Sequence, residues 1–94
     1  MRVYEATYIL KPDMEEDQVE KAKQKFSDYV TRNGGKVVNI DNWGKRKLAY
    51  EIDGHNEGIY ILMKFNANPE SVESLQRDLR ISDDVIKSIV LKLN

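Results

Sequence analysis

The sequence has 94 residues, of which 40% are hydrophobic, so residues 1–94 suit a single small domain with a modest core and leave no room for a second. Lys and Arg total 15 and Asp and Glu total 16, and the formal net charge of -1 excludes a broadly basic protein that holds nucleic acid by bulk attraction. The lack of Cys excludes disulfides and thiolate chemistry, and no apolar run approaches the roughly 20 residues of a membrane helix, so we expect no membrane partner.

The first third of the chain predicts a strand followed by a helix. Residues 1–10 contain many strong strand formers, and Pro12 ends this strand. Asp13 and Glu16 have the spacing of a capping box, so a helix is expected to begin there. Residues 33–35, Asn-Gly-Gly, end the helix because they tolerate positive φ. The apolar stripe of this helix is Val19, Ala22, Phe26, Tyr29 and Val30.

The middle of the chain predicts a β-hairpin. Residues 36–52 form a long extended segment, and the polar residues and glycine between 41 and 44 indicate a bulge or bend within it. Residues 53–58 are typical of a turn, and residues 59–65 have the pattern of a further strand. The two strands are therefore expected to pair with each other.

The last third predicts a second helix and a final strand. Asn68 and Pro69 are typical of an N-cap and a first helical position. The buried stripe of the helix is Val72, Leu75 and Leu79. The two aspartates at 83–84 end the helix, and residues 85–93 predict the last strand.

The order strand, helix, strand, strand, helix, strand predicts an α+β fold, the ferredoxin-like βαββαβ plait. In this fold a four-stranded antiparallel sheet carries two helices on one face, and its other face is open. We expect Ala6, Tyr8, Ile61, Met63 and Phe65 to face the helices. The apolar residues expected on the open face are Val3, Ile9, Tyr60, Leu62, Ile89 and Leu91. A contiguous apolar patch of this kind marks a contact with a partner protein.

Three successive cations, residues 45–47, lie within the second predicted strand. In an extended chain Lys45 and Lys47 share one face, while Arg46 points to the other, so a phosphate backbone could meet either face. The guanidinium of Arg46 can pair with a phosphate in a forked geometry that Lys does not offer. The triplet is therefore a candidate RNA contact.

Two residues near the triplet have open alternatives. Instead of binding phosphate, Arg46 could pack its stem on Tyr50 or pair with Glu51 or Asp41. Trp43 could stack on a base, anchor a partner protein, or fold over the hairpin as a local core.

A second cationic strip is expected from the first and last strands, which are neighbours in this fold. Its members are Arg2, Lys87 and Lys92. Each of them taken alone is more simply a solvated surface charge.

Four stretches carry a resemblance to a known family: Tyr4-Glu5, Ile9-Leu10-Lys11-Pro12, Gly44-Lys45-Arg46-Lys47-Leu48-Ala49-Tyr50-Glu51-Ile52 and Leu79-Arg80-Ile81. With them the whole chain resembles the bacterial small-subunit ribosomal protein six family. The resemblance implies the same plait, and a place on the platform of the small ribosomal subunit in the cytoplasm. It also implies binding to small-subunit rRNA beside ribosomal protein eighteen.

The resemblance and the residue patterns together assign two sets of contacts. The expected RNA contacts are Arg2, Lys45, Arg46, Lys47, Lys87 and Lys92. The expected contacts with the partner protein are Val3, Ile9, Trp43, Tyr60, Leu62, Ile89 and Leu91.

Catalysis and metal binding are not predicted. His55 is the single histidine and lies in a predicted turn, and no nucleophile with a matching base is present. We therefore expect no enzyme activity, no cofactor, no metal and no small-molecule substrate. The alternative function is a ferredoxin-like regulatory module that binds a small molecule and homo-oligomerises through its sheet. A stable homo-oligomer that is indifferent to RNA would favour this alternative.

Overall fold

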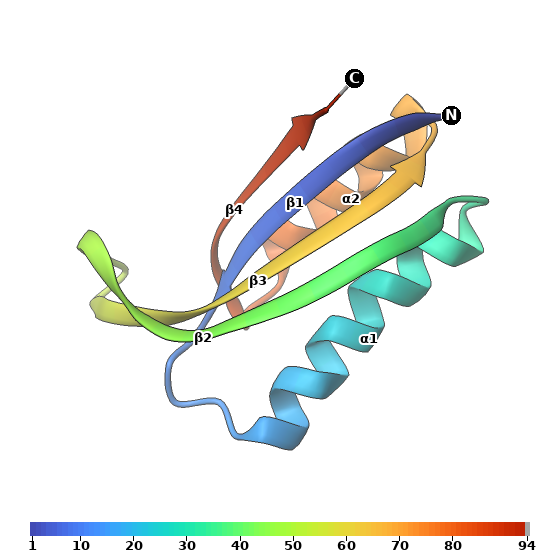
Figure 1. Ribbon diagram of the computed structural model, residues 1–94. Helices are drawn as coiled ribbons and strands as arrows, with labels where there is room; N and C mark the ends of the chain where they lie inside the picture. The colour runs from blue at the N-terminus through green and yellow to red at the C-terminus, as the bar shows by residue number, and fades with distance from the viewer. Residues whose placement is uncertain (94) are drawn as a thin grey trace.

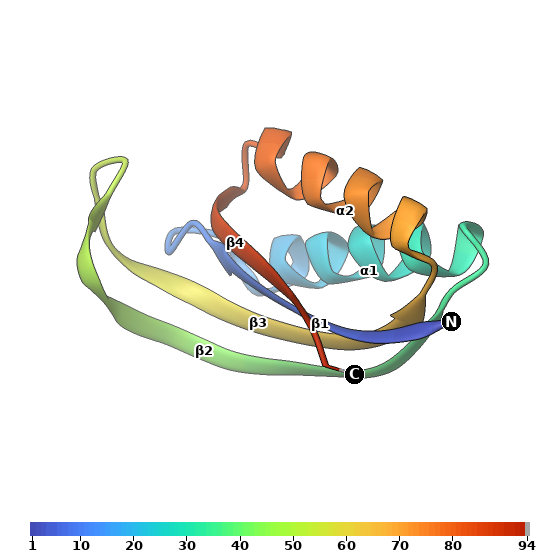
Figure 2. The same cartoon turned by 90° about the horizontal axis from the view of Figure 1, so that it is seen from above.

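The computed structural model describes residues 1–93 and contains six elements in the order predicted (Figure 1). The elements are β1 (Arg2–Leu10), α1 (Glu16–Arg32), β2 (Lys36–Ile52), β3 (His55–Ala67), α2 (Pro69–Ile81) and β4 (Val85–Lys92). The strands form one sheet in the order β2-β3-β1-β4, and all neighbouring pairs are antiparallel. Figure 2 shows both helices on the same face of this sheet. The predicted ferredoxin-like plait is confirmed.

The core lies between the two helices and the sheet face that they cover. The predicted helix stripes are buried apart from Tyr29, which is partly buried at the edge of the core. The sheet contributes Tyr4, Ala6, Tyr8, Leu10, Ile59, Ile61, Met63, Phe65 and Ala67. The rings of Tyr8 and Phe26 meet edge to face, with their centroids 5.1 Å apart. The five sheet residues predicted to face the helices therefore do so.

The start of α1 differs from the prediction. Asp13 and Glu16 do not form the capping box, because Asp13 lies in the turn that follows β1. Glu15 is the N-cap residue, and its backbone N–H donates to Gln18 Oε1 at 2.9 Å. Glu15 and Gln18 have the same spacing as the predicted pair, so the pattern by itself could not distinguish the two starts.

The turn of the β2–β3 hairpin is shorter than predicted. Asp53 and Gly54 form it alone, with φ of 48° and 81°, and His55 already pairs with Ile52. Two central residues with positive φ are typical of the tight turn that matches the twist of the flanking strands. Consequently β3 begins four residues earlier than Ile59, and the hairpin arms extend beyond the rest of the sheet (Figure 2).

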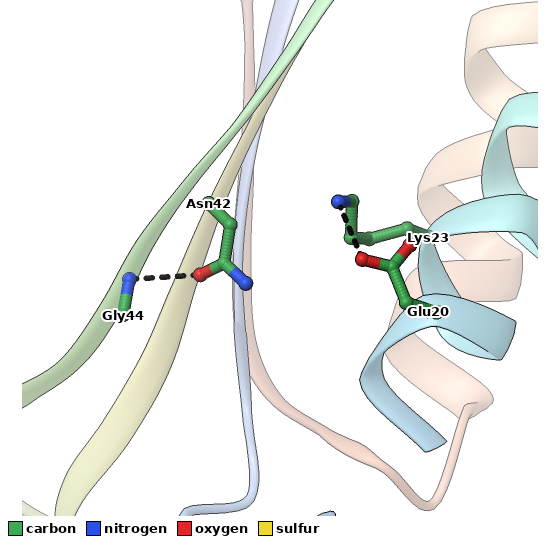
Figure 3. A network of polar contacts seen from close by, with 4 residues as sticks. All are labelled: Glu20, Lys23, Asn42 and Gly44. Atoms are coloured by element: carbon green, nitrogen blue, oxygen red, sulfur yellow. Dashed lines mark hydrogen bonds and ion pairs between the residues drawn. The ribbon is translucent and has the colours of Figure 1, made fainter. Parts of the chain in front are cut away.

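The interruption predicted in β2 is confirmed as a bulge. The register with β3 shifts between Asn42 and Gly44, which leaves Trp43 as the extra residue. Gly44 has a φ of 79°, and its N–H donates to Asn42 Oδ1 at 2.8 Å. Figure 3 shows this bond and, separately, the ion pair on α1 in which Lys23 Nζ lies 3.2 Å from Glu20 Oε1. No helix within residues 1–93 combines the length and apolarity needed to cross a bilayer.

Tyr8 carries a buried hydroxyl with no hydrogen-bond partner among residues 1–93. Burial, and secondarily the negative charge of Glu20, raise the pKa of Tyr8 far above its usual value, so the phenol stays neutral. We expect Tyr8→Phe to stabilise the protein by about 1 kcal/mol, because it removes a polar group that lost its water without gaining a partner. The urea midpoint should rise with an unchanged m-value.

The matched control is Tyr4→Phe, a second core tyrosine whose hydroxyl is not buried without a partner. This control should leave the urea midpoint nearly unchanged. A midpoint that falls in Tyr8→Phe would show that the hydroxyl of Tyr8 is stabilising.

Candidate functional site

The sheet face turned away from the helices mixes apolar and charged side chains. Register places its residues in cross-strand rows of β4, β1 and β3: Leu91, Glu5 and Lys64; Ile89, Thr7 and Leu62; Lys87, Ile9 and Tyr60. Ile89 and Leu91 are 49% and 55% exposed, whereas Val3, Tyr60 and Leu62 are half-buried. Among these three strands, the exposed apolar surface is therefore concentrated on the edge strand β4, while Val38, Trp43 and Tyr50 are exposed on β2 at the other edge.

Ile9 is buried and cannot meet a partner, which corrects its assignment as a contact residue. Its side chain is 6% exposed although it lies outside the helix-covered core. The hairpin covers it at Gly58, where a Cβ atom would overlap Ile9 Cγ2 and lie 3.3 Å from Ile86 Cδ1. This close approach of two backbones depends on the missing side chain of Gly58.

The side chain of Arg46 contacts Trp43 in two ways. The guanidinium carbon of Arg46 lies 5.3 Å from the centre of the Trp43 ring, which is a cation–π contact. Arg46 Nε also donates to the Trp43 carbonyl oxygen at 3.3 Å. The sequence placed these two residues on separate surfaces, one for RNA and one for protein, and the structure brings them together. The alternative of Arg46 packing on Tyr50 is replaced by this contact.

Lys45 and Lys47 lie on the opposite face of the hairpin from Arg46. Lys45 pairs with Ile59, a core residue, whereas Arg46 pairs with Gly58. All three cations are exposed, and none makes an ion pair with another residue of 1–93. The predicted alternation is confirmed, so positive charge projects from both faces of this strand.

Lys87 is held by Tyr50, which was expected from the sequence only as an alternative packing partner of Arg46. Its Nζ donates to Tyr50 Oη at 2.9 Å and lies 5.2 Å from the centre of the Tyr50 ring. This hydrogen bond is the main reason that the pKa of Lys87 is raised above its usual value, so the ammonium stays charged. The bond joins the two edge strands, because the hairpin bends back toward the start of β4. No local sequence pattern could signal a contact across 37 positions.

The predicted strip of Arg2, Lys87 and Lys92 does not form. Lys92 pairs with Tyr4, which points into the core, whereas Lys87 pairs with Ile9 on the other face. Arg2 shares the face of Tyr4 by strand alternation. Arg2 and Lys92 therefore lie near one end of β1 on the helix-bearing face, and Lys87 lies near the other end on the open face.

The described residues, 1 to 93, hold no group of three or more His, Cys, Asp or Glu side chains able to bind a metal ion. His55 lies at the first position of β3, directly after the tight turn. The site therefore offers cations and aromatic rings of the β2–β3 hairpin and β4 for binding.

Comparisons with known proteins agree with the resemblance stated above. A family model described as ribosomal protein S6 matches residues 3–92. The chain is 44% identical over 92 residues to small ribosomal subunit protein bS6 of Desulforamulus reducens, covering 98% of this chain and 97% of that protein. It is also 44% identical over 93 residues to the protein of the same name from Clostridium acetobutylicum, covering 99% and 98%.

A solved structure supports the same conclusion. The crystal structure of 30S ribosomal protein S6 from Thermotoga maritima matches with a TM-score of 0.92 and 26% identity, covering 98% of this chain and 87% of that chain. The family model, the relatives and the fold agree over nearly the full sequence. The chain therefore belongs to the ribosomal protein S6 family.

Proposed function

We propose that residues 1–94 form a single structural domain of the small ribosomal subunit that binds small-subunit rRNA together with ribosomal protein eighteen on the platform. Family membership makes the chain a small-subunit ribosomal protein and not an enzyme. It also favours this function over the regulatory module that binds a small molecule. The location that follows is the ribosome in the cytoplasm.

The main support for an RNA contact is that Lys45, Arg46 and Lys47 are exposed and make no ion pairs within residues 1–93. The net charge of -1 leaves no general attraction to RNA, so binding depends on a local excess of cations. Lys87 lies on the open face of the sheet, the face to which Arg46 also belongs. It is proposed as a further phosphate contact. Arg2 and Lys92 are proposed as a separate contact at the far end of β1.

The proposed surface for ribosomal protein eighteen is the apolar part of the open face. Ile89 and Leu91 are its exposed members, and Leu62, Tyr60 and Val3 flank them. A protein partner that covers this edge would bury apolar surface that water now contacts.

The RNA contact is tested by changing Lys45, Arg46 and Lys47 to Ala together. Cations that neutralise phosphates release counterions, so the slope of log affinity against log salt should fall by roughly one unit for each phosphate that the variant no longer neutralises. Affinity for an rRNA fragment, with ribosomal protein eighteen present, is measured across a salt series for the parent chain and the variant.

The matched control changes Lys21, Lys25 and Arg32 to Ala, which removes the same charge from α1. Its salt slope should remain close to that of the parent chain. Equal slopes for the two triple variants would contradict the proposal, because the effect would then follow net charge alone.

A further inference from the structure

Trp43 presents an aromatic ring to solvent on the hairpin. It is the single tryptophan of the sequence, and 49% of its surface is accessible. As the extra residue of the bulge, it leaves the regular alternation of β2. The positive φ of Gly44 and the bond from its N–H to Asn42 fix the backbone of this bulge. The backbone from which the ring projects is therefore set by the bulge.

Arg46 lies over the Trp43 ring. Its guanidinium carbon lies 5.3 Å from the ring centre, and its Nε–H donates to the carbonyl oxygen of Trp43. The two planar groups are thus arranged before any ligand arrives, which reduces the entropy lost on binding. Aromatic rings and guanidinium planes are the two kinds of surface on which unpaired bases stack.

The charge around the ring decides the kind of partner. Arg46 lies against the ring, is exposed and makes no ion pair within residues 1–93, whereas Lys45 and Lys47 project from the opposite face of the strand. A ligand that covers Trp43 must therefore also accommodate the charge of Arg46, which an apolar protein surface does not. A nucleotide offers a base for the ring and a phosphate for the cations.

We propose that Trp43 and Arg46 form a stacking site for one unpaired nucleobase of RNA, a proposal that rests on the RNA-binding function above. Bases inside a duplex are stacked on each other and do not offer a free face, so the ligand is a bulged or single-stranded nucleotide. The phosphate beside this base contacts the guanidinium of Arg46, the cation of the triplet that lies on this face. The site is distinct from the sheet surface, where Tyr60 is half-buried.

The test uses the emission of Trp43, which reports on this site alone because the chain has no other tryptophan. The full chain is titrated with a single-stranded adenylate hexamer and with an RNA duplex of the same length. Stacking should quench the emission with the hexamer and leave it nearly unchanged with the duplex. Quenching by ribosomal protein eighteen and not by RNA would overturn the proposal in favour of a protein anchor.

Variants separate stacking from simple attraction. Trp43→Ala should weaken hexamer binding about tenfold with an unchanged salt slope, whereas Trp43→Phe should retain most of the affinity. Arg46→Lys keeps the positive charge but removes the planar guanidinium group. It should therefore also weaken hexamer binding without changing the salt slope. Equal affinities for the parent chain and Trp43→Ala would overturn the stacking site.

The two proposals fail in different ways. If the triplet variant lowers the salt slope and Trp43→Ala has no effect, RNA binding stands and the stacking site is wrong. If neither the hexamer nor the rRNA fragment binds at all, both proposals are wrong.

Discussion

Replacing Gly58 with Ala is expected to destabilise the protein by about 1 to 3 kcal/mol, the usual cost of overfilling a well-packed site. The added Cβ would overlap Ile9 Cγ2 and lie 3.2 Å from the carbonyl oxygen of Leu10. Ile9 cannot move aside easily, because its β-branched side chain has few rotamers. Urea unfolding of the parent chain and the variant measures the change in the free energy of unfolding.

The control for this prediction is the same substitution in an Ile9→Ala background. Removing the side chain of Ile9 takes away the atom that Gly58→Ala would overlap. The cost of Gly58→Ala should therefore be smaller in this background, and the difference is the interaction free energy of the two positions. An equal cost in both backgrounds would show that the hairpin does not pack against Ile9.

Changing Ile89 and Leu91 together to Ser is expected to weaken association with ribosomal protein eighteen roughly a hundredfold. Each side chain is about half exposed, and its burial by a partner would contribute about 1 to 2 kcal/mol. Serine removes most of this apolar area and adds no charge to the edge strand. Calorimetric titration of the two proteins, without RNA, measures the dissociation constant.

Ile81→Ser is the matched control for this variant. Ile81 is 71% exposed at the end of α2, away from the open face. Its substitution should leave the affinity for ribosomal protein eighteen unchanged. If Ile81→Ser weakens binding as much as the double variant does, the partner uses the helix-bearing side and the proposed surface is wrong.

The elements of the fold could be predicted because each depends on a short stretch of sequence. Phe26 and Leu79 recur with their neighbours at helical spacing, and the alternation along β1 and β3 fixes which residues face the helices. Errors occurred where two local patterns compete. The capping spacing occurs at both Asp13 and Glu15, and the polar residues after Gly54 concealed the first residues of β3.

The candidate site was predicted only in part. Strand alternation correctly separated Arg46 from Lys45 and Lys47, since this relation is local. The predicted strip with Lys87 failed because Lys87 and Lys92 are separated by an odd number of positions in β4, so strand alternation places them on opposite faces. Which residues meet across a sheet depends on register, which a bulge changes by one residue.

Local sequence patterns account for the order of the elements, the composition of the core and the position of the cationic triplet, since propensity and periodicity act over a few residues. The contact of Trp43 with Arg46 is local to the bulge of β2. Folding of the whole chain was needed to show that Tyr50 holds Lys87 and that Ile9 is buried under the hairpin. These contacts depend on the bulge, the tight turn and the bend of the β2–β3 hairpin acting together. Their combined geometry brings distant residues together, and no single stretch of the chain encodes it.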